Sequence, residues 1–366
     1  RDASATRVIE TDRYRVEAAG DGTLGVLDKR SGRRFEHLHA LEDEADMGDL
    51  YNFCPVEDSV GWRSDDAAVR VLADGPLVHE LELVATAQRP AGLDAAHEQL
   101  PLTITTIARL VEGSDRIEFR TTIDNSCRDH RLRVVFGVGD AEGPVRAEGH
   151  FAVVHRPLQP PAPRTDWVEP PDPTQHTLGA VALGPVALIT RGMPEYEARV
   201  VRGRAELCLT LLRCVGVISQ PTNAIATRPR GAGPQVLTPE GQCLGTQEAE
   251  YALVLGADEL DDTALLRASQ DYRSGFVAVP GELEFAPPVQ LKGDVVFSAL
   301  KGAEDGDGLV LRCFNPAASS VTARIGGPVS ASRTRLDETG GRPLQDGAFE
   351  VAAGQIATVR LRRAGR

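Results

Sequence analysis

The feature that most constrains the fold is a two-residue alternation of apolar and polar side chains. It is clearest over residues 117–124, where one set of alternate positions is Ile, Phe, Thr and Ile and the other is charged or polar. Successive side chains of a strand point to opposite faces, so this pattern predicts a half-buried β-strand. Residues 131–136 repeat the alternation, and the polar segment 125–130 between them has the length of a hairpin connection. Further strand candidates are 14–18, 23–28, 79–85, 103–111, 180–190, 205–211, 250–255, 308–314, 320–325 and 357–361.

Turn signals separate many of these segments, for example at Asp21-Gly22, Ser31-Gly32 and 113–115. Many short strands with frequent Gly and Pro turns predict an all-β chain built of sandwiches rather than α/β layers. The sequence predicts one helix, near residues 262–275, because Asp261-Asp262-Thr263 can cap a segment with helical apolar spacing.

Two proline-rich segments punctuate the chain. The stretch 280–288 follows the predicted helix and is typical of a linker, which predicts a large β domain over residues 1–285 and a small one over residues 289–366. The segment 156–173 predicts a long extended loop across a surface.

The charge balance limits the partners. Lys plus Arg is 40 and Asp plus Glu is 53, so the formal charge is 40 − 53 = −13. This argues against nucleic acid and against an anionic membrane surface, both of which attract basic faces. No apolar run of about 18 residues occurs, and we expect a cytoplasmic protein. The chain begins with Arg1 rather than Met, so we expect a piece of a longer polypeptide.

The six cysteines are widely spaced and contain no CxxC pair. In a chain of this length the pattern favours reduced, mostly buried thiols over a disulfide framework. For the same reason we expect no structural zinc site.

The acidic run from Glu42 to Phe53 is the most informative candidate for a site. As a polar loop it would bring carboxylates, a phenol and an amide to a sugar or a metal, and the alternative is a solvated acidic turn between strands. Its acidic positions do not have the spacing of an EF-hand.

Other candidates carry weaker signals. His37 and His39 would share one face of a strand, a spacing that suits zinc, but two packing or surface histidines are the favoured interpretation. Asp129-His130 could be half of an acid/base dyad or a hydrogen-bonded turn. Glu195 and Glu197 follow a Gly-x-Pro turn and offer two carboxylates, which a glycosidase needs, or a salt-bridged turn. The Gly/Pro-rich loops 228–235 and 239–245 match no phosphate loop, and no Gly-x-Ser-x-Gly elbow occurs.

Several segments together resemble the C-terminal half of bacterial α-mannosidases of glycoside hydrolase family 38. They are 48–55, 124–133, 191–197, 209–216 and 233–245, and residues 298–316 resemble that family's last small β domain. The resemblance covers nearly the whole chain and implies a large mutarotase-like β-supersandwich followed by a small β-sandwich.

The resemblance also implies a function. The parent would be a retaining exo-glycosidase with an Asp nucleophile, a second carboxyl as acid/base and a zinc ion, all mainly on an N-terminal barrel that opens with a His-x-Asp motif. No His-x-Asp occurs here, so we expect no catalytic residue, metal or cofactor in this piece, which alone would be inactive. Its partners would be the barrel of the same polypeptide and an α-mannoside. By the resemblance, Tyr51 would contact the sugar at the pocket edge, supported by Asp49 and Asn52.

Two other functions stay open. A stand-alone mutarotase-type epimerase would need a His acid and a carboxylate base, for which His97 with Glu98 and His130 with Glu195 are the candidates. A carbohydrate-binding or purely structural sandwich is the other, although two Trp and five Tyr are a poor supply of stacking platforms. The oligomeric state stays open, a homo-oligomer included.

Overall fold

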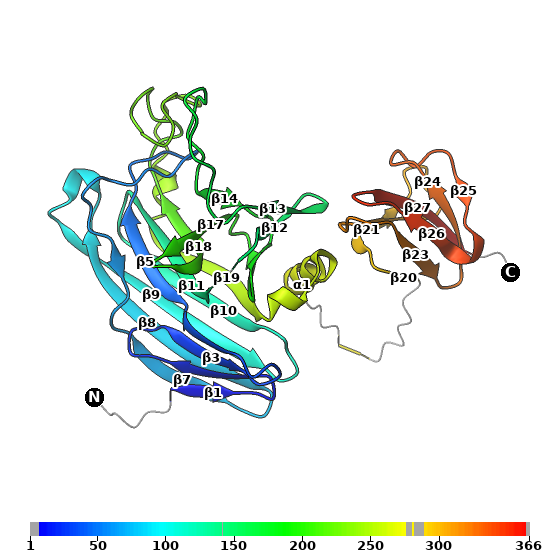
Figure 1. The fold of residues 1–366 in the computed structure, drawn as a ribbon, viewed down its shortest axis with the longest axis horizontal. Helices are drawn as coiled ribbons and strands as arrows, with labels where there is room; N and C mark the ends of the chain where they lie inside the picture. The colour runs from blue at the N-terminus through cyan, green and yellow to red at the C-terminus, as the bar shows by residue number, and fades with distance from the viewer. Residues whose placement is uncertain (1–6, 141, 276–279, 282–288, 364–366) are drawn as a thin grey trace. The chain divides into compact units, whose positions relative to one another are not determined.

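The computed structural model describes residues 7–140, 142–275, 280–281 and 289–363. These residues form strands, short 3-10 helices and, among the described residues, a single α-helix, so the all-β prediction is confirmed (Figure 1). The chain divides into two compact units: Arg1–Ala147 with His155–Glu259, and Glu148–Val154 with Leu260–Arg366. The predicted linker 280–288 lies mostly outside the described residues, and the domain boundary placed there stays a prediction.

Three antiparallel sheets account for the strands up to residue 255. One sheet contains β1 (Val8–Glu10), β2 (Tyr14–Ala18), β3 (Leu24–Asp28) and β4 (Arg34–Leu38). A nine-stranded sheet has the order β13 (Ala152–Arg156), β12 (Val145–Gly149), β15 (Ala180–Leu183), β16 (Val186–Arg191), β19 (Gly245–Leu255), β10 (Ile117–Asn125), β9 (Gln99–Val111), β8 (Val78–Pro90) and β7 (Ala68–Asp74). A six-stranded sheet has the order β14 (Thr174–His176), β17 (Glu195–Val201), β18 (Arg204–Cys214), β11 (His130–Gly139), β5 (Ala40–Ala45) and β6 (Trp62–Arg63).

The nine-stranded and six-stranded sheets pack face to face, which makes the first unit a sandwich. Phe119 of β10 lies with its ring centroid 6.0 Å from that of Phe136 of β11 and 5.2 Å from that of Tyr251 of β19. His39 stacks on Phe119 at 4.9 Å and its Nε2 lies 2.8 Å from the Tyr251 hydroxyl. The four-stranded sheet contributes buried residues such as Tyr14 to the same core.

The second unit contains a smaller sandwich. Its sheets are β20 (Gln290–Lys292), β23 (Val321–Gly326) and β26 (Ala348–Val351), and β21 (Val296–Gly302), β22 (Leu309–Phe314), β27 (Ile356–Arg363), β24 (Val329–Thr334) and β25 (Arg342–Pro343). Ile325 and Phe349 of the first sheet share a core with Leu311 and Val359 of the second.

The helix α1 (Asp262–Ser274) begins where the sequence predicts. The Asp261 carboxylate accepts a hydrogen bond from the Ala264 N–H at 2.7 Å, which satisfies one of the free donors at the helix N-terminus. Ser269 and Arg273 donate to the buried carboxylate of Glu148 at 2.5 and 2.6 Å. The remaining helical turns are η1 (Leu93–Ala95), η2 (Pro239–Gln242), η3 (Ala257–Glu259) and η4 (Gln345–Gly347).

The structure corrects two strand predictions. The segment 125–130 is not a hairpin, because β10 pairs with β9 and β19 while β11 pairs with β5 and β18, so this connection crosses between sheets. The segment 180–190 is two strands, β15 and β16, joined by Gly184-Pro185 with Gly184 at φ 51°. Both strands are almost wholly buried, so no polar alternation marked the turn between them.

Candidate functional site

The site is a cluster of loops at one end of the first unit's sandwich. The register pairs His130 with both Cys214 and Ala45, and Asn125 with Gly245. The end of β5, the start of β11 and the end of β18 therefore lie side by side at one end of their sheet. The end of β10 and the start of β19 lie side by side in the other sheet. The segments that follow β5 and β18 and the connection between β10 and β11 are thereby brought together, although they are far apart in the sequence.

The acidic run does not form a single polar loop, because its first part is the strand β5. Glu42 and Glu44 lie beside Arg133 and Arg131 of β11 in the register. On this outer face of the sheet Arg133 pairs with Glu44 at 2.8 Å, and it also pairs with Glu197. Burial acts to raise the pKa of Glu42, but Arg199 and Arg133 hold that pKa below its usual value. Glu42 and Glu44 therefore belong to a strand, not to a loop, and their carboxylates pair with arginines of neighbouring strands.

The loop that begins at Asp46 is organised by that residue's buried side chain. One carboxylate oxygen accepts hydrogen bonds from the Gly48 and Cys54 N–H groups at 2.8 and 3.0 Å. The other accepts from Arg213 Nε at 2.8 Å. Burial raises the pKa of Asp46, and Arg213 with the two backbone donors offsets only part of that rise.

Asp49 is fully buried and holds the tip of the same loop. Its Oδ1 accepts from the N–H groups of Tyr51 and Asn52 at 3.0 and 3.1 Å. Its Oδ2 accepts from the Gln220 N–H at 2.7 Å and pairs with the Arg228 guanidinium. Asp49 therefore supports the loop from within and does not itself face a ligand.

Tyr51 stands at the surface of this framework. Of the five tyrosines, Tyr51 is 54% exposed, whereas the other four are at most 3% exposed. The Arg228 guanidinium carbon lies 5.6 Å from the Tyr51 ring centroid. The ring also lies close to Gly233, where an added Cβ would lie 2.9 Å from the tyrosine oxygen. The Tyr51 N–H donates to Asp49, whereas its side chain is more than half exposed.

Asn52 connects the loop to its neighbours through both ends of its side-chain amide. The oxygen accepts from Arg228 Nε at 2.8 Å, and the nitrogen donates to Asp172 at 3.2 Å. Asp172 belongs to the proline-rich segment 156–173, most of which has no regular structure. The predicted extended loop thus helps to hold the Tyr51 loop.

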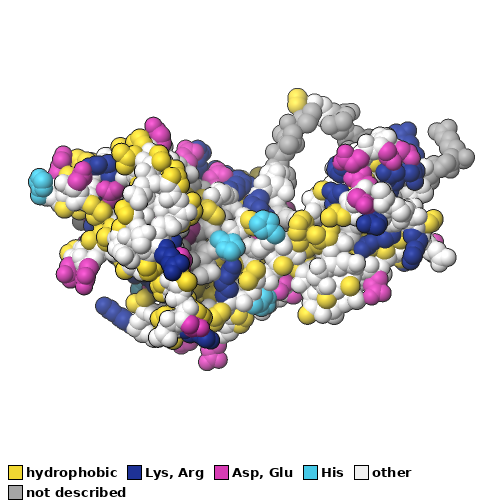
Figure 2. All heavy atoms as spheres, turned by 90° about the horizontal axis from the view of Figure 1, so that it is seen from above, with side chains coloured by type: hydrophobic (Ala, Val, Ile, Leu, Met, Phe, Trp, Pro, Cys, Tyr) yellow, Lys and Arg dark blue, Asp and Glu magenta, His cyan; other side chains and the backbone are white. Residues whose placement is uncertain are grey.

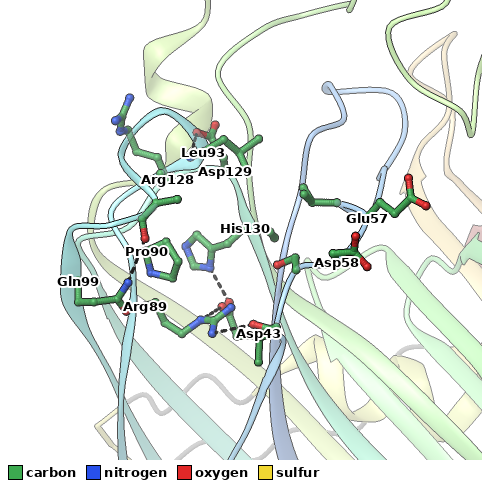
Figure 3. A pocket seen from close by; sticks show the side chains of 16 residues that line it. Asp43, Glu57, Asp58, Arg89, Pro90, Leu93, Gln99, Arg128, Asp129 and His130 are labelled. Carbon is green, nitrogen blue, oxygen red and sulfur yellow. Dashed lines mark hydrogen bonds and ion pairs between the residues drawn. The ribbon is translucent and has the colours of Figure 1, made fainter.

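A cavity of about 560 Å³ lies in the same first unit (Figure 3). At its floor lies the fully buried Asp43 carboxylate, which accepts a hydrogen bond from Arg89 Nε and contacts His130 Nδ1, each at 2.6 Å. His130 Nε2 lies 3.1 Å from the Asn125 side-chain oxygen, which also accepts from the Cys127 N–H. Both imidazole nitrogens are therefore engaged in the fold. Its lining also includes the apolar side chains of Val56, Val60 and Leu93.

Other predicted candidates are not brought together. His37 lies near the end of β4, and His39 lies between β4 and β5. Both have positive φ, 57° and 65°, so the two side chains do not share a strand face. His39 is buried in the core and His37 is exposed. This agrees with the packing interpretation.

The two candidate epimerase pairs also have unsuitable geometry. His130 lies on the core side of β11 with Asp43, whereas Glu195 accepts from Thr210 on the outer face and lies 3.8 Å from Arg131. His97 and Glu98 are exposed neighbours after η1. Asp129, the partner proposed for His130, instead exchanges hydrogen bonds with the Gln242 side chain.

On the face shown in Figure 2, Lys and Arg side chains are interspersed with Asp and Glu. Within the described part of the chain, no group of three His, Cys, Asp or Glu side chains could hold a metal ion. No described helix is long and apolar enough to cross a membrane.

No sequence pattern pointed to the residues that hold the site together. Arg228, Gln220 and Arg213 lie more than 160 residues beyond the loop they clamp. Arg228 belongs to a Gly/Pro-rich loop that the sequence singled out, but its partner could not be inferred from spacing.

The comparisons with known proteins define the class. The profile described as "Glycosyl hydrolases family 38 C-terminal domain" matches residues 9–215. The chain therefore belongs to glycosyl hydrolase family 38 and carries its C-terminal domain, as the resemblance predicted.

Individual relatives agree with this assignment. The curated protein "Putative mannosylglycerate hydrolase" from Halalkalibacterium halodurans is 27% identical over 339 aligned positions, which cover 84% of this chain and 36% of that protein. A solved α-mannosidase from Enterococcus faecalis matches this chain with a TM-score of 0.81 at 24% identity. The match covers 97% of this chain and 42% of the α-mannosidase chain. A second structure from that organism, described as a protein in the glycosyl hydrolase family 38, has a TM-score of 0.80 at 23% identity, covering 97% and 44%. The chain thus spans less than half the length of these relatives.

Proposed function

We propose that this chain is the C-terminal β-region of a retaining α-mannosidase, and that it packs on an N-terminal catalytic barrel. The proposal is supported by the family membership and by the names of the two mannoside-cleaving relatives. In it, the nucleophile, the acid/base carboxyl and a zinc ion belong to the barrel, and the described residues of this chain supply none of them. This chain alone would not hydrolyse a mannoside.

The contribution of this chain to the reaction would be Tyr51 at the edge of the mannoside pocket. The observation that carries this role is that Tyr51 is the exposed tyrosine, on a loop whose backbone is fixed by the buried Asp49. A fixed loop loses little conformational freedom when a ligand binds, so its phenol can donate to a sugar hydroxyl at low entropic cost. Asn52 and Asp49 act by positioning that loop.

The experiment is Tyr51→Phe in the polypeptide that joins this chain to its catalytic barrel, with an aryl α-mannoside as substrate. Loss of one neutral hydrogen bond costs about 0.5–1.5 kcal/mol, so kcat/KM should fall about 2- to 13-fold. Tyr14→Phe is the matched control, because the Tyr14 hydroxyl donates to Asp115 O at the opposite end of the sandwich. Unchanged kcat/KM in Tyr51→Phe would contradict the sugar contact. The absence of any α-mannosidase activity in the joined wild-type protein would contradict the function.

A further inference from the structure

Two cysteines from distant segments meet at the loop end of the first unit. Cys214 is the last residue of β18, and Cys243 directly follows η2. Asn125 Nδ2 lies 3.4 Å from Cys214 Sγ and 3.1 Å from the Cys243 carbonyl oxygen. The Val215 N–H donates to the Gly241 oxygen at 3.0 Å, which ties together the backbones beside the two cysteines. Cys243 Sγ donates to the same Gly241 oxygen at 3.6 Å, so this backbone contact lies against the Cys243 side chain as well.

The surroundings make the two sulfurs unlike each other. Interaction with the Cys214 side chain lowers the pKa of Cys243 to about 6, and the nearby His130 lowers it further, whereas burial acts to raise it. The same interaction, together with burial, raises the pKa of Cys214. Cys214 is fully buried, whereas Cys243 is only half-buried. A partly accessible cysteine of lowered pKa near a second, buried cysteine is the usual arrangement of a redox-sensitive pair.

The other four cysteines have a different environment. Cys54, Cys127, Cys208 and Cys313 are all buried. Burial raises the pKa of Cys208 to about 12 and that of Cys313 to about 11, and it also raises the pKa of Cys127. Such thiols react slowly with oxidants, so selectivity for the Cys214–Cys243 pair is expected.

We propose that Cys214 and Cys243 form a redox-active dithiol, in which a hydroperoxide oxidises Cys243 and Cys214 resolves the product to a disulfide. The Cys243 sulfur attacks one peroxide oxygen, the O–O bond breaks, and the leaving hydroxide takes a proton to become water. Cys243 is then a sulfenic acid. The Cys214 sulfur attacks the Cys243 sulfur, the S–O bond breaks, and the released hydroxide takes the Cys214 proton. Two thiols lose two electrons, and hydrogen peroxide becomes two waters.

The disulfide would join the two ends of the segment 214–243, which holds the Tyr51 loop in place. The segment between the two cysteines contains Gln220 and Arg228, both bonded to Asp49. Oxidation would therefore fix both ends of the segment that clamps the site. The chemistry itself needs no glycosidase activity, so this inference stands or falls separately from the proposed function.

The test is a peptide map of the chain after treatment with hydrogen peroxide and alkylation under denaturing conditions. Each of the six cysteines lies on its own tryptic peptide, so every pairing is distinguishable. The expected product joins peptide 214–230 to peptide 231–267, has lost two hydrogens, and separates on reduction. Full alkylation of both cysteines, a crosslink between any other pair, or Cys243 sulfinic acid without a crosslink would overturn the proposal.

Variants and limited proteolysis supply independent readouts. In Cys214→Ser, Cys243 should be trapped as its sulfenic acid by dimedone, whereas Cys127→Ser should keep the crosslink. Trypsin can cut the native chain after the exposed Arg230, which lies inside the segment that the disulfide would close. The two fragments of the oxidised chain should stay together on a non-reducing gel and separate on a reducing one. Separation under both conditions would refute the disulfide even if a variant failed to fold.

Discussion

Arg228→Ala tests the interpretation that the Tyr51 loop is held by a buried ion pair. Asp49 is fully buried and the Arg228 side chain is 4% exposed. The guanidinium bonds Asp49, the Asn52 side-chain oxygen and the Arg230 carbonyl. Removing it leaves the Asp49 carboxylate with three backbone N–H donors and no cation. Removal of one partner from a buried pair costs about 3–5 kcal/mol, and we expect the surviving donors to keep the loss near the lower figure.

The assay is urea unfolding followed by tryptophan fluorescence. Both tryptophans, Trp62 and Trp167, belong to the first unit, so their signal is not mixed with that of the second unit. Arg230→Ala is the matched control, because this neighbouring arginine is exposed and should change the free energy of unfolding by less than about 0.5 kcal/mol.

A double-mutant cycle separates the pair from general loosening of the loop. Asp49→Asn alone leaves the Arg228 charge buried without its carboxylate, so it should also destabilise the unit. The double variant should cost less than the sum of the single changes, by about 0.5–3 kcal/mol. Arg228→Ala as mild as Arg230→Ala, or strict additivity in the cycle, would refute the reasoning.

Two further substitutions test the core and the loop backbone. Burial lowers the pKa of His39 from 6.5 to about 4, so the unfolded chain binds a proton at a higher pH than the folded one. The stability linked to His39 is full above pH 6.5 and falls as the pH is lowered toward 4, by about 3 kcal/mol in all. Asparagine tolerates the positive φ at this position, so His39→Asn keeps the backbone. Urea unfolding at several pH values should then show a free energy of unfolding that depends less on pH, by the binding of one proton. An unchanged slope of that free energy against pH would contradict the assignment. Gly48→Ala would place a Cβ 2.0 Å from the Asn52 carbonyl oxygen and should destabilise the first unit by about 1–3 kcal/mol, whereas Gly75→Ala meets only ordinary contacts and serves as its control. Equal melting temperatures for the two glycine variants would show that the loop adapts freely.

The strands were predictable wherever one face is buried and the other is exposed to solvent. The alternation over 117–124 predicted β10 almost to its last residue, and the Asp261 cap predicted the start of α1. The prediction failed where burial on both faces removes the pattern, as in residues 180–190. It also failed at 125–130, because loop length alone does not tell which sheet the next strand joins.

The candidate site was predictable only in part, for a related reason. The resemblance pointed to Tyr51, Asp49 and Asn52, and the structure places them on one loop with Asp49 inside it. The acidic run was expected to be one loop, but Glu42 and Glu44 are strand residues because arginines on β11 neutralise them. The partners Arg228 and Gln220 are brought to Asp49 by the sheet register, and no local pattern in the sequence carries that information.

The most direct test of the central proposal compares α-mannosidase activity with and without the catalytic barrel. The purified chain should release no p-nitrophenol from p-nitrophenyl α-mannoside above the rate without protein. The same chain joined to its N-terminal catalytic half should release it catalytically. Turnover by the chain alone, or none by the joined protein, would contradict the proposal.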